Sequence, residues 1–168
     1  MKRPSFIIAW NASMRVYDPV DPMAKAAKVI GGYVAININA PPPKNWKNAC
    51  AIRMSYILNY SGVIIPSNIK KTVSGADKMN YFFRVPDVLD FLKRRWGNPD
   101  EIISYPPSGG GVALAGKKGV ILFEVSGWSN AQGHATLFDG HTCYDHCYFN
   151  EPEVNYHTDQ ANFWSLPQ

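Results

Sequence analysis

One stretch of sequence, residues 48–62, constrains the fold of this chain more than any other. The segment 41–47 before it contains three consecutive prolines, which remove backbone donors and hold the chain extended, so no helix can run through it. Asn48 then stands where its side-chain carbonyl can accept a free backbone N–H as an N-cap, and Gly62 is suited to end a helix in a left-handed turn. These signals predict one helix between the two residues.

The predicted helix is apolar on nearly every side, which indicates that it is packed inside the protein. Cys50 lies in its first turn, where the positive end of the helix dipole and unpaired N–H groups favour the thiolate form. Because the thiolate is the nucleophilic form, this position suits attack on a carbonyl group. The alternative is that Cys50 is a small, inert core residue. The strongly polar residues of the helix are Arg53, Ser55 and Asn59, of which we expect Arg53 and Asn59 to be partners for buried backbone or carboxylates.

Composition indicates one globular domain spanning residues 1–168. Hydrophobic residues make up 46% of the chain and charged residues 18%, which excludes a disordered chain. Thirteen glycines and thirteen prolines imply many turns, and so an α+β or β-rich fold rather than a helical bundle. A net charge of +4 favours weak attraction to anionic polymers such as cell wall. Because the basic cluster 93–95 falls at the end of a predicted helix, we expect no nucleic-acid binding.

The first residues combine positive charge with a short apolar run, as a signal peptide does. Asn11, Arg15 and Asp18 interrupt that run too early for a secretory signal, and no segment is long and apolar enough to span a membrane. We therefore expect a protein made in the cytoplasm without a signal peptide, not inserted in a membrane, and exported, if at all, by another machine.

Element signals elsewhere predict helices and short strands. Pro4 suits the opening of a first helix, Asp21 and Pro22 the start of a second, and Gly97 the end of a third. The run 119–125 is almost entirely apolar, which predicts a central strand. Helices are expected at about 4–14, 22–30 and 86–96. Extended segments are expected at 33–38, 81–85, 119–125, 134–138 and 144–149, with the tail 150–168 sealing an edge of the core.

The three cysteines suggest one pair and one free thiol. Cys143 and Cys147 are close enough in sequence to bridge if the local backbone turns. A zinc-binding module is the alternative, although the spacing matches no common zinc finger. The histidines near this cysteine pair are His141, His146 and His157.

A cysteine nucleophile needs a base and a group that orients the base. His134 opens one predicted strand and Asp145 lies on the next, so a helix packed on an antiparallel sheet can bring both to Cys50. His134 taken alone is better explained as a hydrogen-bonded core or rim histidine than as a catalytic base. Asp139 is a rival to Asp145, but Asp-Gly is first a turn signal and strand alternation points Asp139 away from the face of His134.

Two segments of the chain resemble a known family of bacterial toxins, the fourth family of type VI secretion amidase effectors. The first is 48–56 around Cys50, and the second runs from 127–129 through 133–140 to 143–149. The N-terminal residues 3–6 match moderately and the middle of the chain poorly. These effectors are small NlpC-like peptidoglycan amidases of the papain superfamily. The resemblance therefore implies an α+β, papain-like fold in which the nucleophile helix packs on an antiparallel sheet.

The resemblance also implies roles for particular residues. Cys50 becomes the nucleophile, His134 the base and Asp145 the group that orients the histidine, with a disulfide between Cys143 and Cys147. The implied reaction is that of a DL-endopeptidase, which hydrolyses the bond between γ-D-glutamate and meso-diaminopimelate in peptidoglycan stem peptides. The implied partners are the stem peptide, a cognate immunity protein and the type VI apparatus, which delivers the toxin to the periplasm of a Gram-negative cell.

Substrate contacts are expected from Asn48 and from Trp128. The alternative for Trp128, given equal weight, is that its ring only packs against neighbouring side chains. Phe138 stands where many relatives carry Trp, a difference that bears on substrate contacts. The backbone N–H of Cys50 is the simplest receiver of the oxyanion. We expect no metal and no cofactor. A housekeeping NlpC-like cell-wall peptidase is a further alternative, disfavoured because such an enzyme needs an export route of its own.

Overall fold

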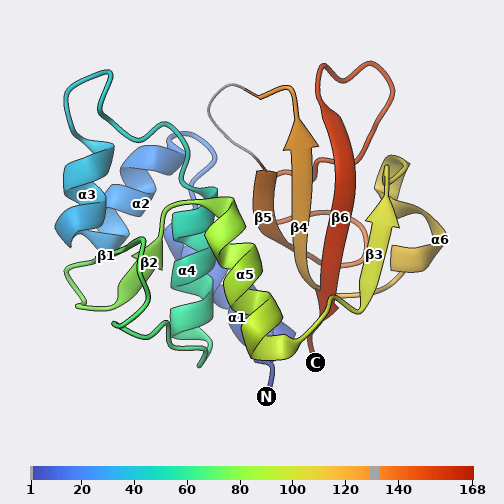
Figure 1. Cartoon of the computed structure of the whole chain (residues 1–168), viewed down its shortest axis with the longest axis horizontal. Helices are drawn as coiled ribbons and strands as arrows, with labels where there is room; N and C mark the ends of the chain where they lie inside the picture. Colours follow the sequence, from blue (N-terminus) through green and yellow to red (C-terminus); the bar gives the residue numbers. More distant parts are fainter. Residues whose placement is uncertain (1, 129–132) are drawn as a thin grey trace.

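The computed structural model describes residues 2–128 and 133–168, so Ser129 and the rest of the predicted loop segment 129–132 lie outside the described part. The helices are α1 (Phe6–Val16), α2 (Pro22–Ile30), α3 (Gly32–Ile38), α4 (Cys50–Tyr60), α5 (Val85–Trp96) and α6 (Gly111–Leu114), with a 3-10 turn at Ser108–Gly110. The strands are β1 (Thr72–Ser74), β2 (Asn80–Phe82), β3 (Glu101–Ser104), β4 (Gly119–Ser126), β5 (Gly133–Phe138) and β6 (His157–Ser165). Helices α1 to α5 gather on one side of the molecule, and a four-stranded sheet lies on the other, with α6 beside β3 (Figure 1).

Helix α4 is the predicted buried helix. Every residue from Cys50 to Asn59 is buried, and only Tyr60 reaches solvent. Gly62 adopts a φ of 99°, which an L side chain rarely tolerates, and the chain turns out of the helix there as expected. No helix in the described part of the chain has the length and apolar character needed to cross a bilayer.

The sheet is fully antiparallel in the order β3-β6-β4-β5. In β4, Val120 and Leu122 join the core beneath the helices, whereas Ile121 and Phe123 join a second core on the opposite face. Both faces of the strand are therefore covered, which explains the apolar run at 120–123. The central position predicted for this strand is confirmed.

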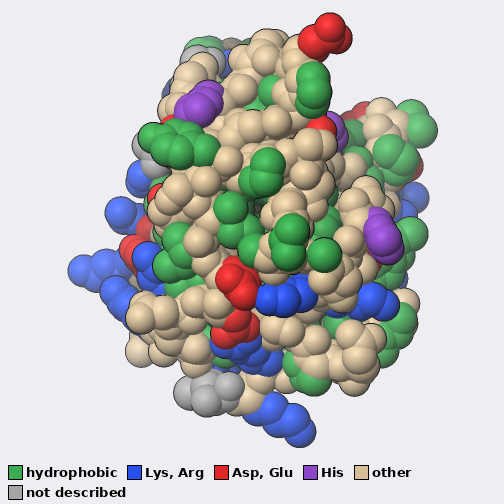
Figure 2. All heavy atoms as spheres, turned by 90° about the vertical axis from the view of Figure 1, so that its right-hand side faces the viewer, with side chains coloured by type: hydrophobic (Ala, Val, Ile, Leu, Met, Phe, Trp, Pro, Cys, Tyr) green, Lys and Arg blue, Asp and Glu red, His purple; other side chains and the backbone are tan. Residues whose placement is uncertain are grey.

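The second face of the sheet is covered by α6 and by the segment between β5 and β6, residues 139–156, which we call the β5–β6 loop. Phe149 of this loop packs edge-on against Phe123 and Phe138, with ring centroids 5.1 and 5.7 Å apart. On the side of the molecule that carries β3 and α6, hydrophobic side chains are scattered among polar and charged ones (Figure 2). The second core lies beneath the loop, whereas Ile102 of β3 and Val112 of α6 are exposed on this side.

Two expected extended segments are not strands. Residues 33–38 form α3, in which Val34 and Ile38, four residues apart, are both buried against the core. Packing of this helical pair outweighs the β-propensity of the run. Residues 144–149 are irregular, because a disulfide and side-chain hydrogen bonds hold them in place of a strand ladder.

The ends of the chain also differ from expectation. The first helix begins at Phe6 rather than Pro4, and Ser5 is its cap residue. The tail does not seal an edge: β6 is a nine-residue strand inside the sheet, between β3 and β4. Its length is hidden in sequence because His157, Asp159 and Gln160 interrupt the apolar pattern where the strand passes the rim of the sheet.

Candidate active site

Cys50 is the first residue of α4, and its side chain points toward the start of β5. Its Sγ lies 3.9 Å from the carbonyl oxygen of Gly133, and the residue is 2% exposed. Because β5 is the edge strand nearest to α4, the buried thiol meets the strand that carries His134. Gly133 has to be a glycine, since a Cβ there would lie 2.2 Å from the carbonyl oxygen of Phe123.

His134 is the second residue of β5 and is buried beside Cys50. Its Nε2 lies 2.9 Å from Oδ2 of Asp145, an ion pair in which the carboxylate is not well aligned with the N–H bond. This pairing leaves Nδ1 as the ring nitrogen that serves the thiol. The imidazole packs edge-on against Tyr148, with centroids 4.8 Å apart, so its ring is fixed on two sides.

Asp145 comes from the β5–β6 loop, not from a strand as the sequence suggested. The hydroxyl of Thr136 and the backbone N–H of His146 both donate to its Oδ1, each over 2.6 Å. Thr136 stands two residues after His134 and therefore on the same face of β5. The structure thus brings Cys50, His134 and Asp145 together from a helix, a strand and a loop. Asp139 instead caps the turn of its own loop by accepting the N–H groups of His141 and Thr142.

Arg53 is the element of the site that sequence reasoning underestimated. Its Nη2 donates to Oδ2 of Asp145 over 3.0 Å, and its Nε donates to the hydroxyl of Tyr144 over 3.2 Å. The guanidinium also lies 5.1 Å from the ring centre of Tyr17. A carboxylate partner was expected, but not the carboxylate that also holds His134. The available signal was spacing: Arg53 follows Cys50 by three residues and so lies on the same side of α4.

The charges in the site stabilise the thiolate–imidazolium form. Burial alone would raise the pKa of Cys50, but the hydrogen bond and charge of His134, the backbone N–H of Ala135 and the charge of Arg53 outweigh it and lower that pKa. Burial likewise opposes protonation of His134, yet Asp145 and the thiolate raise its pKa to about 9. His134 and Arg53 together hold the pKa of Asp145 well below its usual range despite burial. The cysteine and histidine therefore behave as a coupled ion pair at neutral pH.

The backbone N–H of Cys50 is already in use. It donates to Oδ1 of Asn48 over 3.1 Å, so the predicted capping contact exists, although Ala49 rather than Asn48 is the residue at the cap position. The N–H that we expected to receive an oxyanion therefore has an intramolecular acceptor in this structure. Asn48 is exposed, which leaves its side chain free to turn away.

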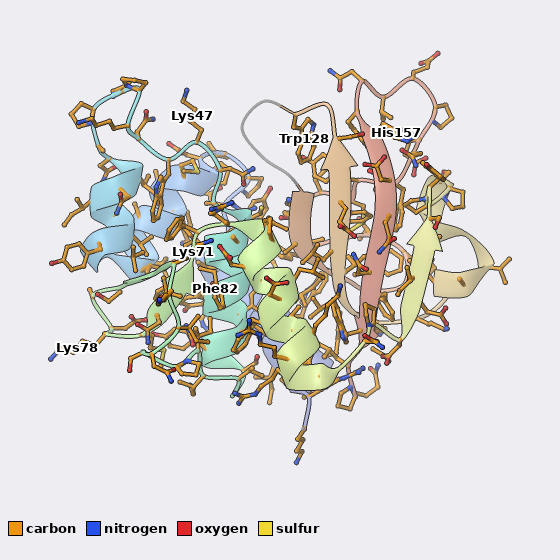
Figure 3. The ribbon with its side chains drawn as sticks, viewed as in Figure 1. Lys47, Lys71, Lys78, Phe82, Trp128 and His157 are labelled. Carbon is orange, nitrogen blue, oxygen red and sulfur yellow. A yellow bond between two sulfur atoms is a disulfide. The ribbon has the colours of Figure 1, made fainter. Side chains whose placement is uncertain are left out.

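A cavity of about 420 Å³ lies beside the site, between the segment before α4 and the sheet. Trp128 lies just after β4 and Lys47 just before α4, in the two halves of the molecule (Figure 3), and both line the cavity. The cavity is lined by Lys47, Asn48, Trp128, His146, Tyr148, Asn155 and Tyr156. Asn48 and Trp128, the two predicted substrate contacts, therefore line the same cavity. The other five lining residues were not predicted to contact substrate.

Cys143 and Cys147 form the disulfide that the resemblance implied, with Cα atoms 5.3 Å apart. Their thiols are thus committed to each other, and no cluster of three or more metal-ligating side chains occurs within residues 2–128 and 133–168. Phe138, the position where many relatives carry Trp, is fully buried against Phe149. Its difference from those relatives concerns core packing and does not alter a substrate contact directly.

Comparisons with known proteins identify the family and the fold. The model of the family "Type VI secretion system (T6SS), amidase effector protein 4" matches residues 46–164. The effector Tae4 from Salmonella typhimurium, solved with the immunity protein Tai4 from Enterobacter cloacae, is 40% identical, with a TM-score of 0.87 over 98% of this chain and 100% of that chain. Tae4 from Enterobacter cloacae, solved in complex with Tai4, is 42% identical, with a TM-score of 0.85 over 98% and 99%. Tae4 from Enterobacter cloacae alone is 43% identical, with a TM-score of 0.84 over 99% of both chains. No curated protein matched.

Proposed function

The chain belongs to the type VI secretion system amidase effector 4 family, and from that premise we propose that it cleaves the γ-D-glutamyl–meso-diaminopimelate amide of peptidoglycan stem peptides. Cys50 is the nucleophile, His134 the general acid and base, and Asp145 the group that orients the imidazole. The observation that carries the proposal is one buried, unpaired thiol beside an imidazole held by a carboxylate. Such a set needs no metal and no cofactor.

The first chemical step forms a tetrahedral intermediate. The Cys50 thiolate attacks the carbonyl carbon of the γ-glutamyl amide, and the electron pair of the C=O bond moves onto oxygen. The N–H of Cys50 can stabilise that oxyanion once the amide of Asn48 turns away, and the turned amide then offers its own N–H₂ group to the same oxygen. Asn48 is therefore the second donor of this oxyanion hole.

In the later steps His134 first donates a proton to the leaving amine and then accepts one from water. The His134 imidazolium donates its proton to the amine of diaminopimelate, which leaves as the C–N bond breaks and a thioester to Cys50 remains. Neutral His134 then takes a proton from water, the resulting hydroxide attacks the thioester, and the thiolate leaves as the ion pair re-forms. Asp145 stays ionised throughout, which its contacts with Arg53, Thr136 and the N–H of His146 favour.

The biological setting follows from the relatives. The similar Tae4 structures include complexes with Tai4, so we infer that an inhibitory immunity protein binds this effector in the producing cell. We also infer type VI delivery and action on the cell wall in the periplasm of a Gram-negative target. Expression with an added periplasmic signal should lyse cells, whereas expression in the cytoplasm should be tolerated. Lysis from the cytoplasm alone would identify a different substrate.

The direct test is digestion of Gram-negative sacculi with the wild type and with Cys50→Ala, followed by mass spectrometry of the muropeptides. Wild type should release fragments ending in γ-linked D-glutamate, and Cys50→Ala should lose at least about 10³-fold in rate, as removal of a catalytic nucleophile does. The thermal unfolding midpoints should remain similar. Equal product formation by the variant, or cleavage of another bond, would contradict the proposal.

A further inference from the structure

The cavity beside Cys50 is lined by two basic side chains. They are Lys47 and His146, and none of the described residues that line the cavity is an Asp or Glu. Within the part of the chain that the structure describes, neither side chain takes part in an ion pair. Both are exposed and lie on opposite margins of the cavity, one before α4 and the other on the β5–β6 loop. Two nitrogen groups thus line a cavity whose described walls offer them no carboxylate.

Aromatic rings connect this cavity to the reacting groups. Tyr148 packs edge-on against His146, with centroids 4.6 Å apart, and against His134, with centroids 4.8 Å apart. Trp128 contacts the same tyrosine at 4.8 Å. Tyr148 is therefore the single ring between His146 and the catalytic imidazole. The cavity wall at His146 and the imidazole of His134 therefore share one aromatic neighbour.

We propose that Lys47 and His146 form a subsite for a free carboxylate that flanks the scissile amide. This inference rests on the proposed function, because the γ-D-glutamyl–diaminopimelate amide has such a carboxylate on each side: the α-carboxylate of D-glutamate and a carboxylate of diaminopimelate. An ammonium and an imidazole N–H are suitable donors to a carboxylate. The subsite makes free stem peptides better substrates than their amidated forms.

The test uses three synthetic stem peptides: one with both carboxylates free, one with the glutamate α-carboxylate amidated and one with the diaminopimelate carboxylate amidated. Lys47→Met and His146→Gln should each raise KM for the free peptide about fivefold to tenfold with kcat nearly unchanged, since a charge-assisted hydrogen bond is lost in binding. On the peptide whose recognised carboxylate is amidated, wild type should already show the higher KM, and neither variant should raise it further. That peptide identifies which carboxylate is bound.

Lys44→Met and His141→Gln are matched controls, because both residues are exposed, lie on the same two segments and do not line the cavity. Their KM values should stay within twofold of wild type. Wild type that cleaves all three peptides with equal KM overturns the subsite and leaves the proposed function standing. Wild type that cleaves none of them overturns the proposed function itself. Binding of the peptides to Cys50→Ala by calorimetry provides a readout independent of turnover, and equal affinity for all three also overturns the subsite.

Discussion

Two regions of the molecule carry the proposed catalytic groups, and the two are held in place in different ways. Helix α4 presents Cys50 from inside the core, where its neighbours Ala51 and Ile52 are almost completely buried. The β5–β6 loop presents Asp145 from an irregular segment, held by hydrogen bonds, an ion pair with Arg53 and a disulfide that encloses it. Apolar packing positions the proposed nucleophile, and directional polar contacts position the carboxylate.

The comparison indicates where mutations should act. Changes in α4 that leave Cys50 in place should mainly alter stability, because packing is distributed over many contacts. Changes around Asp145 should alter the orientation and charge of His134, because each polar contact there has a defined direction. Arg53 belongs to both regions, since it is buried in α4 and bonded to the loop.

The largest expected effect tests the carboxylate. Asp145→Asn should lower kcat by about 10³-fold or more, because an amide neither stabilises the imidazolium nor fixes its tautomer. Stem-peptide hydrolysis under saturating substrate measures it. Asp139→Asn is the matched control on the same loop: asparagine can still accept the N–H groups of His141 and Thr142, so activity should stay within twofold. Equal losses in the two variants would remove the distinction between a functional and a turn carboxylate.

The next effect tests the link between the regions. Arg53→Met removes one partner of a buried ion pair and should lower the free energy of unfolding by about 3–5 kcal/mol. Denaturant unfolding at pH 7 measures it, with Ile52→Val in the same helix expected to cost about 1 kcal/mol. A loss for Arg53→Met no larger than that of Ile52→Val would show that the ion pair does not join helix and loop.

The disulfide should contribute less, because it closes only a short loop. Replacing Cys143 and Cys147 together by alanine should cost about 2 kcal/mol, the chain-entropy value for so small a ring. Thermal unfolding with and without reductant measures it: reductant should lower the midpoint of the wild type and leave that of the double variant unchanged. The double variant should also lose activity at temperatures where it is still folded, because Asp145 lies between the two cysteines. If complete reduction of the disulfide left the unfolding midpoint of the wild type unchanged, this account would be contradicted.

Sequence reasoning succeeded where position depends on local pattern. Periodicity, turn residues and alternation over a few residues predicted the approximate bounds of α4 and the central position of β4. They also predicted that Asp139 belongs to a turn and points away from His134. It failed where distant contacts decide: α3 was expected to be extended, β6 was expected to be a sealing tail, and Asp145 was expected on a strand. The partnership of Arg53 with Asp145 spans 92 residues, so no local pattern contains it.

The smallest effect alters the shape of the pH profile rather than its height. Activity should rise as pH increases through the lowered pKa of Cys50 and fall as pH increases through the pKa of His134, about 9, because only the thiolate–imidazolium pair reacts. Arg53 helps to keep the pKa of Cys50 low, so Arg53→Met should move the acid limb to higher pH, whereas Arg53→Lys, which retains the charge, should move it less. Profiles of kcat/KM between pH 4 and 10 measure both limbs, with concentrations of folded protein determined at each pH. If the acid limb of Arg53→Met stays at the wild-type pH, Arg53 holds the β5–β6 loop but does not lower the pKa of Cys50. Other groups of the site, such as His134, would then set that pKa.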